Sequence, residues 1–233
     1  MSLFLNQNEG YYSLTKEGII TIVIIIGILV VMTSLLKKRE RMETETHKER
    51  RSGFSAKQLV FCAAALSLGF ATSYIKVFSM PWGGSVTLCS MLFVTLIGYW
   101  YGLRVGLTAG FAYGLLQFIQ GGGGYILSPL QIGLDYIFAF AALGLSGVFY
   151  KKRYGLMKGY ILAILARGLF HAIGGYLYWM EYMPDSFPKS LEKIYPFAYN
   201  YAYILAEGII TIVILALPPV QNAMAKVKRM AVE

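Results

Sequence analysis

Seven apolar runs, most of them long enough to cross a lipid bilayer as helices, constrain the fold of this chain more than any other feature. A membrane-spanning helix needs about 17–25 apolar residues to cross a hydrocarbon core of about 30 Å. A closed β-barrel would instead need alternating segments of about ten residues, which this sequence does not show. The pattern therefore predicts an all-α membrane protein. Charged or Gly/Pro-rich breaks separate the runs, which lie at about 18–36, 57–77, 86–101, 103–119, 126–149, 159–180 and 197–217.

Composition agrees with a lipid environment for most of the chain. Of its 233 residues, 57% are hydrophobic and only 14% are charged, whereas about a quarter of the residues in soluble domains are charged. The apolar stretch 86–119 predicts two short helices that separate at YWYGLR, and the alternative is one long tilted span. The glycine-rich sequence GGGGY at 121–125 predicts a firmer break.

The basic residues are distributed in a way that indicates membrane topology. Of the 21 lysines and arginines, seven lie in 37–51, four in 151–158 and three in 226–230, and Lys57 and Arg104 flank helix ends. Threading the chain with residues 37–51 in the cytoplasm places all of these inside, as the positive-inside rule requires. The net charge of +9 therefore argues for a multi-pass protein of the cell membrane and against nucleic acid binding, with attraction to anionic lipid as a secondary expectation. Seven spans predict an N-terminus outside and a C-terminus in the cytoplasm.

The first apolar run has the features of a retained helix. The run is long, and a basic block follows it directly, which is a stop-transfer pattern rather than that of a cleaved signal. We therefore expect an extra N-terminal transmembrane helix in 1–36, a basic cytoplasmic linker in 37–55 and a six-helix membrane domain in 56–233.

The octapeptide EGIITIVI occurs at 17–24 and again at 207–214. Both copies are expected to run inward from a glutamate at the outer interface, and the second is expected to open the last helix. Chance convergence and partial duplication both remain explanations of the repeat.

Few ionisable residues lie within the predicted spans, and these are informative because charge inside a membrane is costly. Those that are candidates for a polar site are Asp135, Arg167 and His171. Arg167 and His171 are four residues apart, so they share one helix face. Asp135 and Arg167 are expected either to form an ion pair between helices or to line a polar ligand pocket in the outer half of the bilayer, and both can hold together.

Aromatic residues favour the pocket. The chain has 18 tyrosines and three tryptophans, many of them toward the predicted outer helix ends, although aromatic belts occur at membrane interfaces in general. Aromatic faces beside a buried carboxylate suit a flat, cationic heteroaromatic ligand.

The motifs of several enzyme classes are missing. The sequence has no GxxxxGK[ST] phosphate loop, no HExxH and no GxSxG. Its two cysteines, Cys62 and Cys89, lie in predicted spans and indicate neither a disulfide framework nor a metal site. We expect no catalytic residues, no metal and no cofactor.

From about residue 57 onward the sequence resembles the thiamine-specific substrate-binding (S) component of energy-coupling factor (ECF) transporters. The resemblance covers roughly three quarters of the chain, and the order and spacing of its blocks make it specific. It implies a six-helix protein that binds thiamine with high affinity at its outer side and lacks an ATPase of its own. It also implies a separate coupling subunit and two ATPase subunits as partners. The blocks are SMPWGGSV (79–86), YGLRVGLTAGFAYGLLQ (101–117), YILSPLQIGLDYIFAFAALGLSGVF (125–149), RGLFHAIGGYLYW (167–179) and YPFAYNYAYILAEG (195–208).

The resemblance also implies which residues meet the ligand. Asp135 stands where many relatives have Glu and compensates the positive charge of thiamine. Tyr195 and Asn200 are expected to read the aminopyrimidine edge, and Trp82 to close over the ligand. The implied thiamine-binding residues are Trp82, Tyr113, Tyr125, Asp135, Tyr136, Arg167, His171, Trp179, Tyr195 and Asn200.

Small residues on the first core helix are expected to contact the coupling subunit. S components use an AxxxA pattern there, and this chain offers Ala63 with Ser67 or Ala65 with Gly69. The same spacing also serves ordinary helix packing. The alternatives to a thiamine-binding subunit are an S component for a thiamine precursor or phosphate ester and a stand-alone ion-coupled carrier.

Overall fold

The computed structural model describes residues 5–8, 11–14, 54–81, 83–121 and 127–233. The chain divides into two units, Met1–Gly53 and Phe54–Glu233. In the first unit, strands β1 (Leu5–Asn8) and β2 (Tyr11–Leu14) pair antiparallel. The expected helix at 18–36, the linker up to residue 53 and the first copy of the octapeptide lie outside the described residues.

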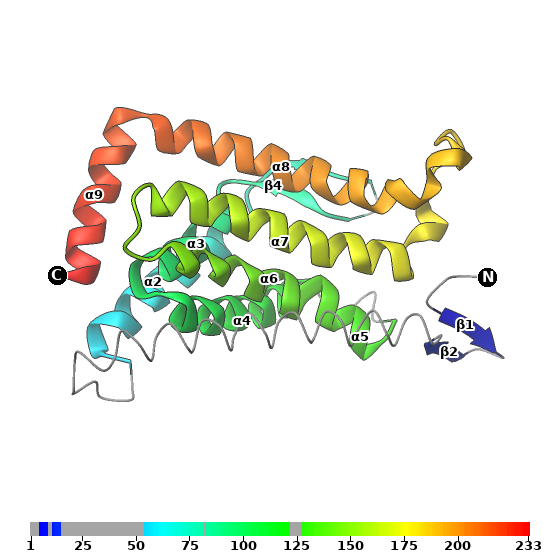
Figure 1. Cartoon of the computed structure of the whole chain (residues 1–233), viewed down its shortest axis with the longest axis horizontal. Helices are drawn as coiled ribbons and strands as arrows, with labels where there is room; N and C mark the ends of the chain where they lie inside the picture. Colours follow the sequence, from blue (N-terminus) through cyan, green and yellow to red (C-terminus); the bar gives the residue numbers. More distant parts are fainter. Residues whose placement is uncertain (1–4, 9–10, 15–53, 82, 122–126) are drawn as a thin grey trace. The chain divides into compact units, whose positions relative to one another are not determined.

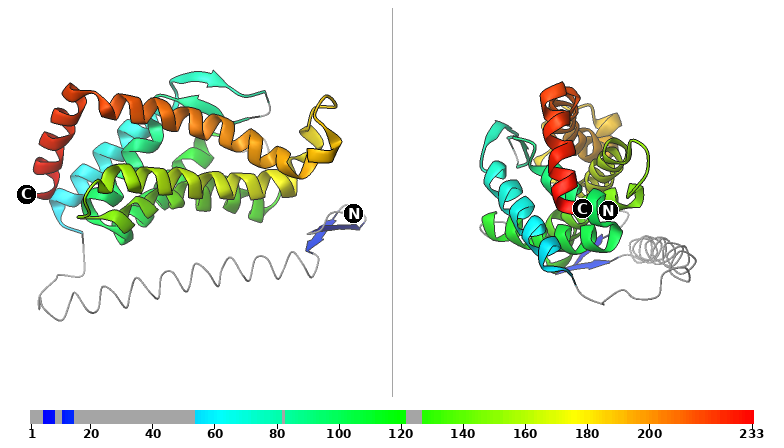
Figure 2. Two further views of the ribbon diagram at one scale, coloured as in Figure 1. Left: turned by 45° about the horizontal axis from the view of Figure 1, so that its top comes forward. Right: turned by 90° about the vertical axis from the view of Figure 1, so that its left-hand side faces the viewer.

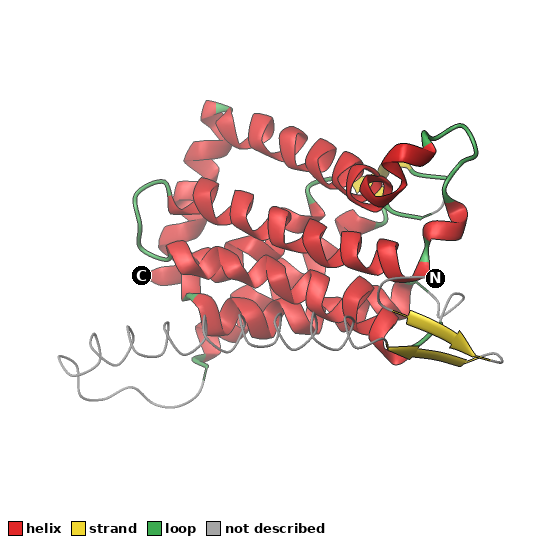
Figure 3. Cartoon of the chain, turned by 45° about the vertical axis from the view of Figure 1, so that its right-hand side comes forward, coloured by secondary structure: helices red, strands yellow, loops and turns green. Residues whose placement is uncertain are grey.

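The second unit is a bundle of apolar helices (Figure 1). Four of its helical segments, Ala56–Ser73, Pro129–Phe149, Gly155–Tyr178 and Lys189–Ala216, are long and apolar enough to cross a membrane, and a shorter apolar helix spans Ser90–Tyr101. Figure 3 shows helices throughout this unit, and its two described strands pair as one small hairpin. The elements are α2 (Ala56–Ser73), β3 (Lys76–Ser79), β4 (Ser85–Thr87), α3 (Ser90–Tyr101), α4 (Leu103–Gln120), α5 (Pro129–Ile132), η1 (Gly133–Phe138), α6 (Ala139–Ala141), η2 (Ala142–Phe149), α7 (Gly155–Tyr178), η3 (Met180–Tyr182), η4 (Lys189–Ile194), α8 (Tyr195–Ala216) and α9 (Pro218–Val232).

The apolar stretch 86–119 forms two helices, so the alternative of one long tilted span is wrong. The break lies at Gly102, whose φ of +88° is a conformation that glycine adopts without steric cost. Its N–H still donates to Gly98 O at 2.8 Å, which closes the last turn of α3. The two helices then pack closely, because a Cβ on Gly106 would lie 2.7 Å from Gly98 Cα.

The segment Pro129–Phe149 is an irregular helix that changes its winding three times, from α to π, back to α and then to 3-10. Ser128 caps its start by accepting from Gln131 N, a short α-helical turn follows, and Gly133–Phe138 then forms a π-helix. The segment ends in the 3-10 helix η2. Single π-helical turns within helices often occur at functional sites, and this one carries Asp135.

Two elements of this unit were not predicted from the sequence. Helix α2 ends at Ser73, and the chain continues into the antiparallel hairpin β3–β4, where the sequence pattern had extended the helix to 77. Helix α9 follows α8 after Leu217 and turns sharply away from it (Figure 2). Tyr101 Oη fixes the end of α9 by donating to Ala231 O at 3.0 Å.

The second octapeptide does not open the last helix, and its glutamate does not lie at an interface. Helix α8 begins at Tyr195, so 207–214 forms its second half. The Glu207 side chain is only 2% exposed. Its carboxylate accepts from the N–H groups of Thr87 and Met91 at 2.9 and 3.2 Å. The hydroxyls of Thr87 and Ser90 also donate to it, at 2.6 and 3.2 Å.

Glu207 thus replaces a missing cap on α3. The N-cap residue of α3, Cys89, makes no side-chain cap bond. A carboxylate at a helix N-terminus satisfies free N–H groups and interacts favourably with the helix dipole. A residue of α8 therefore fixes both the start of α3 and the end of the hairpin.

Candidate functional site

The predicted site residues that the structure brings together lie at the end of the bundle opposite α9, where η1, the second half of α7 and the first half of α8 meet (Figure 1). The π-helical turn supplies Asp135, α7 supplies Arg167 and His171, and Trp179 follows the last turn of α7. These four side chains form one connected polar cluster.

Asp135 is the centre of this cluster. Its Oδ2 accepts from Gln131 Nε2 at 2.7 Å and from the indole Trp179 Nε1 at 3.2 Å. Its Oδ1 lies 3.9 Å from His171 Nδ1, which is too far for a direct hydrogen bond. A carboxylate oxygen can accept two bonds, so Oδ1 retains acceptor capacity toward a further donor or a cation.

The Asp135 side chain lies against the backbone of α7. A Cβ added at Gly174 would lie 2.5 Å from Asp135 Oδ1. Any larger residue at this position would push the carboxylate away. Gly174 therefore determines where the carboxylate can lie.

Arg167 approaches Asp135 through a histidine. Arg167 Nε donates to His171 Nε2 at 3.3 Å, so His171 Nε2 acts as the acceptor and the ring hydrogen belongs on Nδ1, facing Asp135. The Arg167 guanidinium lies 4.4 Å from the centre of the Phe140 ring, a cation–π distance. In the part of the chain that the structure describes, no direct Asp135–Arg167 ion pair forms, and His171 takes that place.

Aromatic rings surround His171. Phe140 lies edge-on to it with ring centroids 6.2 Å apart, and Tyr203 approaches from α8 at 6.3 Å. Tyr203 Oη donates to Asn200 Oδ1 at 3.0 Å. The α8 residues thus connect to the same cluster through Tyr203.

The first turns of α8 carry the other predicted polar residues. Asn200 Nδ2 donates to Pro196 O at 2.8 Å, which leaves its second amide hydrogen available. The ring centroids of Tyr195 and Tyr199 lie 5.7 Å apart. Tyr199 Oη donates to Gly83 O at 3.0 Å. The chain just before β4 is therefore attached to α8 beside Asn200.

Two predicted residues point elsewhere. Tyr113 is fully buried and its hydroxyl donates to Gly69 O at 2.9 Å. Its ring contacts the cluster through Phe140, with ring centroids 5.4 Å apart. Tyr136 packs against Phe118 of α4 at 5.4 Å. Both support the site from behind in this structure. Trp82 and Tyr125 lie outside the described residues.

Three residues join the cluster without having been predicted to do so. They are Gln131, Phe140 and Tyr203. Gln131 lies four residues before Asp135, so helical spacing alone could have indicated it. Phe140 and Tyr203 have no comparable sequence signal, because apolar and aromatic residues are common throughout these helices.

The small residues of α2 separate into two faces. Ala65 and Gly69 are buried within the chain, and a Cβ on Gly69 would lie 3.3 Å from Phe93 Cβ of α3. This pair packs the bundle and is not accessible to a partner. Ala63 and Ser67 are exposed.

The cluster offers one partly free carboxylate, an imidazole, an indole and a carboxamide, among aromatic rings. Asp135 and His171 remain 15% and 12% exposed. Among the described residues, no group of three or more His, Cys, Asp or Glu side chains is placed to hold a metal ion. The arrangement suits recognition of a flat cation with hydrogen-bonding edges, since it combines charge, acceptors and rings.

Comparisons with known proteins place this bundle in a family. The family model described as "Thiamine transporter protein" matches residues 59–227. The thiamine transporter ThiT of Bacillus subtilis is 33% identical over 171 residues, which cover 68% of this chain and 85% of the relative. ThiT of Lacticaseibacillus paracasei is 32% identical over 129 residues, covering 49% and 63%.

A solved structure agrees. ThiT from Listeria monocytogenes superimposes with a TM-score of 0.54 at 26% identity, covering 70% of this chain and 94% of that chain. The match and the candidate spans together make this a multi-pass membrane protein with a helical S-component fold. Because the family model covers more than half of the sequence, the chain belongs to the thiamine transporter protein family.

Proposed function

We propose that this chain is the thiamine-binding S component of an ECF importer and that Asp135 is its central ligand contact. The observation that carries the proposal is the carboxylate of Asp135, which has two donors on Oδ2 and none within hydrogen-bonding distance on Oδ1 among the described residues. Thiamine has a permanent positive charge on its thiazolium ring and a flat aminopyrimidine with donors and acceptors. Either a donor of the aminopyrimidine or the thiazolium charge fits the free oxygen.

The position of Arg167 supports this proposal. An arginine paired directly with Asp135 would compete with a cationic ligand for one carboxylate. Here its guanidinium lies on Phe140 and its Nε donates to His171. Arg167 therefore acts by orienting His171, and the charge of Asp135 stays available to the ligand.

The remaining predicted residues receive roles by their place around Asp135. Trp179 and His171 offer faces for stacking, and Asn200 and Tyr195 offer hydrogen bonds from α8. The other proposed contributors are Trp82, Tyr125, Tyr113 and Tyr136. Of these, Tyr113 and Tyr136 are proposed to support the residues that contact the ligand without contacting it themselves. A base stacked on an aromatic side chain gains about 1–3 kcal/mol, so these rings add to the charge interaction.

Binding of thiamine to the purified chain tests this function. We expect thiamine to quench tryptophan fluorescence and to release heat in calorimetry, with a stoichiometry of one. A parallel titration with a thiamine precursor and with thiamine monophosphate separates the related ligands by their affinities. Folded protein that binds none of these compounds contradicts the proposal.

We further propose that transport requires partner subunits, namely an ECF coupling subunit and two ATPases. The sequence contains no GxxxxGK[ST] phosphate loop, so ATP would be used by the partners. The exposed pair Ala63 and Ser67 is the proposed docking stripe on α2. Vesicles that contain this chain alone are expected to show no uptake, and robust uptake there would favour a stand-alone carrier.

The docking stripe can be tested on one helix. Ala63→Trp should reduce copurification with the coupling subunit, because close helix approach requires small residues. Ala64→Trp is the matched control, since Ala64 is also exposed but lies about 100° around the helix. Equal loss in both variants would contradict a specific stripe.

The proposed orientation follows the basic residues. Residues 151–158 and 226–230 lie at the end of the bundle that contains α9, and Asp135 lies at the other end. By the positive-inside rule the α9 end faces the cytoplasm and the Asp135 cluster faces outside. Cysteine labelling in intact cells at Asp185 and at Asn222, both exposed, should label only the first.

A further inference from the structure

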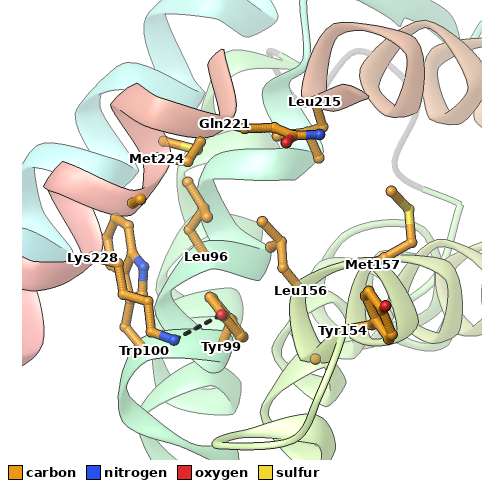
Figure 4. A pocket seen from close by; sticks show the side chains of 12 residues that line it. Leu96, Tyr99, Trp100, Tyr154, Leu156, Met157, Leu215, Gln221, Met224 and Lys228 are labelled. Carbon is orange, nitrogen blue, oxygen red and sulfur yellow. Dashed lines mark hydrogen bonds between the residues drawn. The ribbon is translucent and has the colours of Figure 1, made fainter. Parts of the chain in front are cut away.

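A cavity lies away from Asp135, at the end of the bundle where α9 packs. Its volume is about 360 Å³. It lies between the end of α3, the start of α7, the end of α8 and one face of α9 (Figure 4). Its side chains belong to no part of the proposed thiamine site.

The side chains that line the cavity are mostly apolar, and one of them carries a positive charge. Six of the lining side chains are Leu96, Trp100, Leu156, Met157, Leu215 and Met224, and none of the twelve lining residues is acidic. Lys228 is the one charged residue among the twelve. The cavity therefore suits a ligand that combines a hydrocarbon part with a negative charge.

Two cations are held at this cavity by tyrosines that line it. Lys228 Nζ lies 2.9 Å from Tyr99 Oη and 4.8 Å from the centre of its ring, as the dashed line in Figure 4 shows. From the loop before α7, the Arg153 guanidinium lies 4.9 Å from the Tyr154 ring and donates to its hydroxyl at 3.1 Å. The two cations thus come from separate elements, and neither has a carboxylate partner among the described residues.

The helix that covers the cavity, α9, is amphipathic. Val220, Met224 and Val227 pack toward the bundle and Ala231 is buried, at spacings that place them on one face. Its basic residues Lys226, Lys228 and Arg229 are exposed. The basic face of α9 thus stays exposed at the end of the bundle that we propose faces the cytoplasm, where lysines and arginines attract anionic lipid headgroups.

We propose that this cavity binds one anionic phospholipid, with an acyl chain against the apolar lining, the phosphate at Lys228, and Arg153 beside Tyr154 as a second source of positive charge. Charge complementarity favours this occupant, since the ammonium group of a zwitterionic lipid offsets the attraction of its phosphate to the cations and an uncharged detergent has no anion to offer them. Free phosphate would leave the apolar lining unfilled. Basic pockets between helices at the cytoplasmic side are a recognised form of lipid-headgroup site.

The purified full chain tests the site by native mass spectrometry. We expect retention of phosphatidylglycerol over phosphatidylcholine with identical acyl chains, and no competition by inorganic phosphate. Lys228→Gln should reduce phosphatidylglycerol retention about fivefold, the effect of one cation near an anionic headgroup. Lys226→Gln is the matched control, because Lys226 is an exposed lysine of the same helix outside the cavity lining.

A second pair of variants tests the cavity itself. Ala225 is exposed and lines the cavity, whereas Ala223 is exposed and does not. Ala225→Trp should fill the cavity and abolish lipid retention, and Ala223→Trp should leave it unchanged, with circular dichroism confirming the fold of both.

Three outcomes would overturn the proposal. Equal effects of Lys228→Gln and Lys226→Gln would mean diffuse attraction between a basic surface and lipid. Unchanged lipid retention by Ala225→Trp would place the lipid elsewhere. If Ala225→Trp keeps its lipid but loses assembly with the coupling subunit, the cavity is a protein interface.

Discussion

Two carboxylates within this bundle, half-buried Asp135 and buried Glu207, differ in how many hydrogen bonds they accept. Glu207 is 2% exposed and accepts from two backbone N–H groups and two hydroxyls, distributed over both oxygens. Asp135 is 15% exposed, and both of its short hydrogen bonds fall on one oxygen. The described residues thus donate hydrogen bonds to both oxygens of Glu207 but to only one oxygen of Asp135.

This difference separates a structural acid from a ligand-binding acid. Every donor to Glu207 comes from the end of the hairpin or the start of α3, so its charge is used to fix the fold. The donors to Asp135 come from Gln131 and Trp179, which orient the carboxylate and leave Oδ1 open. A buried charge that the protein does not satisfy is costly, so its retention at Asp135 fits a ligand that completes it.

The largest expected effect is the loss of thiamine binding in Asp135→Asn. The substitution keeps the shape of the side chain and removes its charge, and loss of one partner of a buried charge pair costs about 2–5 kcal/mol. Affinity should fall at least about 30-fold, measured by calorimetry. Asp185→Asn is the control, since Asp185 is an exposed carboxylate.

Asp135→Asn should leave the melting temperature nearly unchanged, because asparagine keeps an acceptor oxygen and the substitution does not break a hydrogen-bond network that fixes the fold. A melting temperature that falls as far as the affinity would contradict the assignment of Asp135 as a ligand contact.

Glu207→Ala should show the reverse pattern. It leaves the N–H groups of Thr87 and Met91 without their acceptor inside the bundle, and breaking a buried charged network costs about 3–5 kcal/mol. The melting temperature in detergent should fall markedly. Protein that remains folded at low temperature should still bind thiamine.

Glu207→Gln provides a graded version of this test. The amide keeps one acceptor oxygen, so the loss of stability should be smaller than for alanine. Wild-type melting behaviour in both variants would mean that the Glu207 cap contributes nothing to the fold.

A smaller effect is expected from Gly174→Ala, which acts on Asp135 without touching its charge. The new methyl group would lie 2.5 Å from Asp135 Oδ1, and overpacking of this kind costs about 1–3 kcal/mol. Thiamine affinity should fall about tenfold.

A double-mutant cycle gives the control for this effect. If Gly174 acts through the carboxylate, Gly174→Ala should add little to Asp135→Asn, since residues in contact are not additive. Full additivity of the two changes would show that Gly174 acts independently of Asp135.

The sequence predicted the features that depend on local composition and failed where two elements must meet. Long apolar runs predicted the membrane spans. Helical spacing placed Arg167 and His171 on one face, and in the structure Arg167 Nε lies 3.3 Å from His171 Nε2. The short strands of β3–β4 and the amphipathic α9 have no long apolar run, so hydropathy could not indicate them.

The polar contacts between helices were harder to predict. Glu207 was expected at an interface because the octapeptide was expected to open its helix. The contact that buries it is with Thr87, 120 residues earlier in the chain, and no local pattern indicates such a contact. The contact of Trp179 with Asp135 spans 44 residues. Likewise, only packing against α3 separates buried Ala65 from exposed Ala63. Sequence spacing carries no information about which face of α2 turns inward.

The smallest expected effect comes from deletion of residues 1–52. All of the proposed thiamine contacts lie in the second unit, Phe54–Glu233, and the family match begins at residue 59. Both carboxylates of the comparison and all of their described partners are retained in the shortened chain. Its thiamine affinity and its melting temperature should therefore equal those of the full chain within error. If affinity alone falls, the first unit contributes to the site that holds Asp135. If the melting temperature alone falls, it supports the fold that Glu207 fixes.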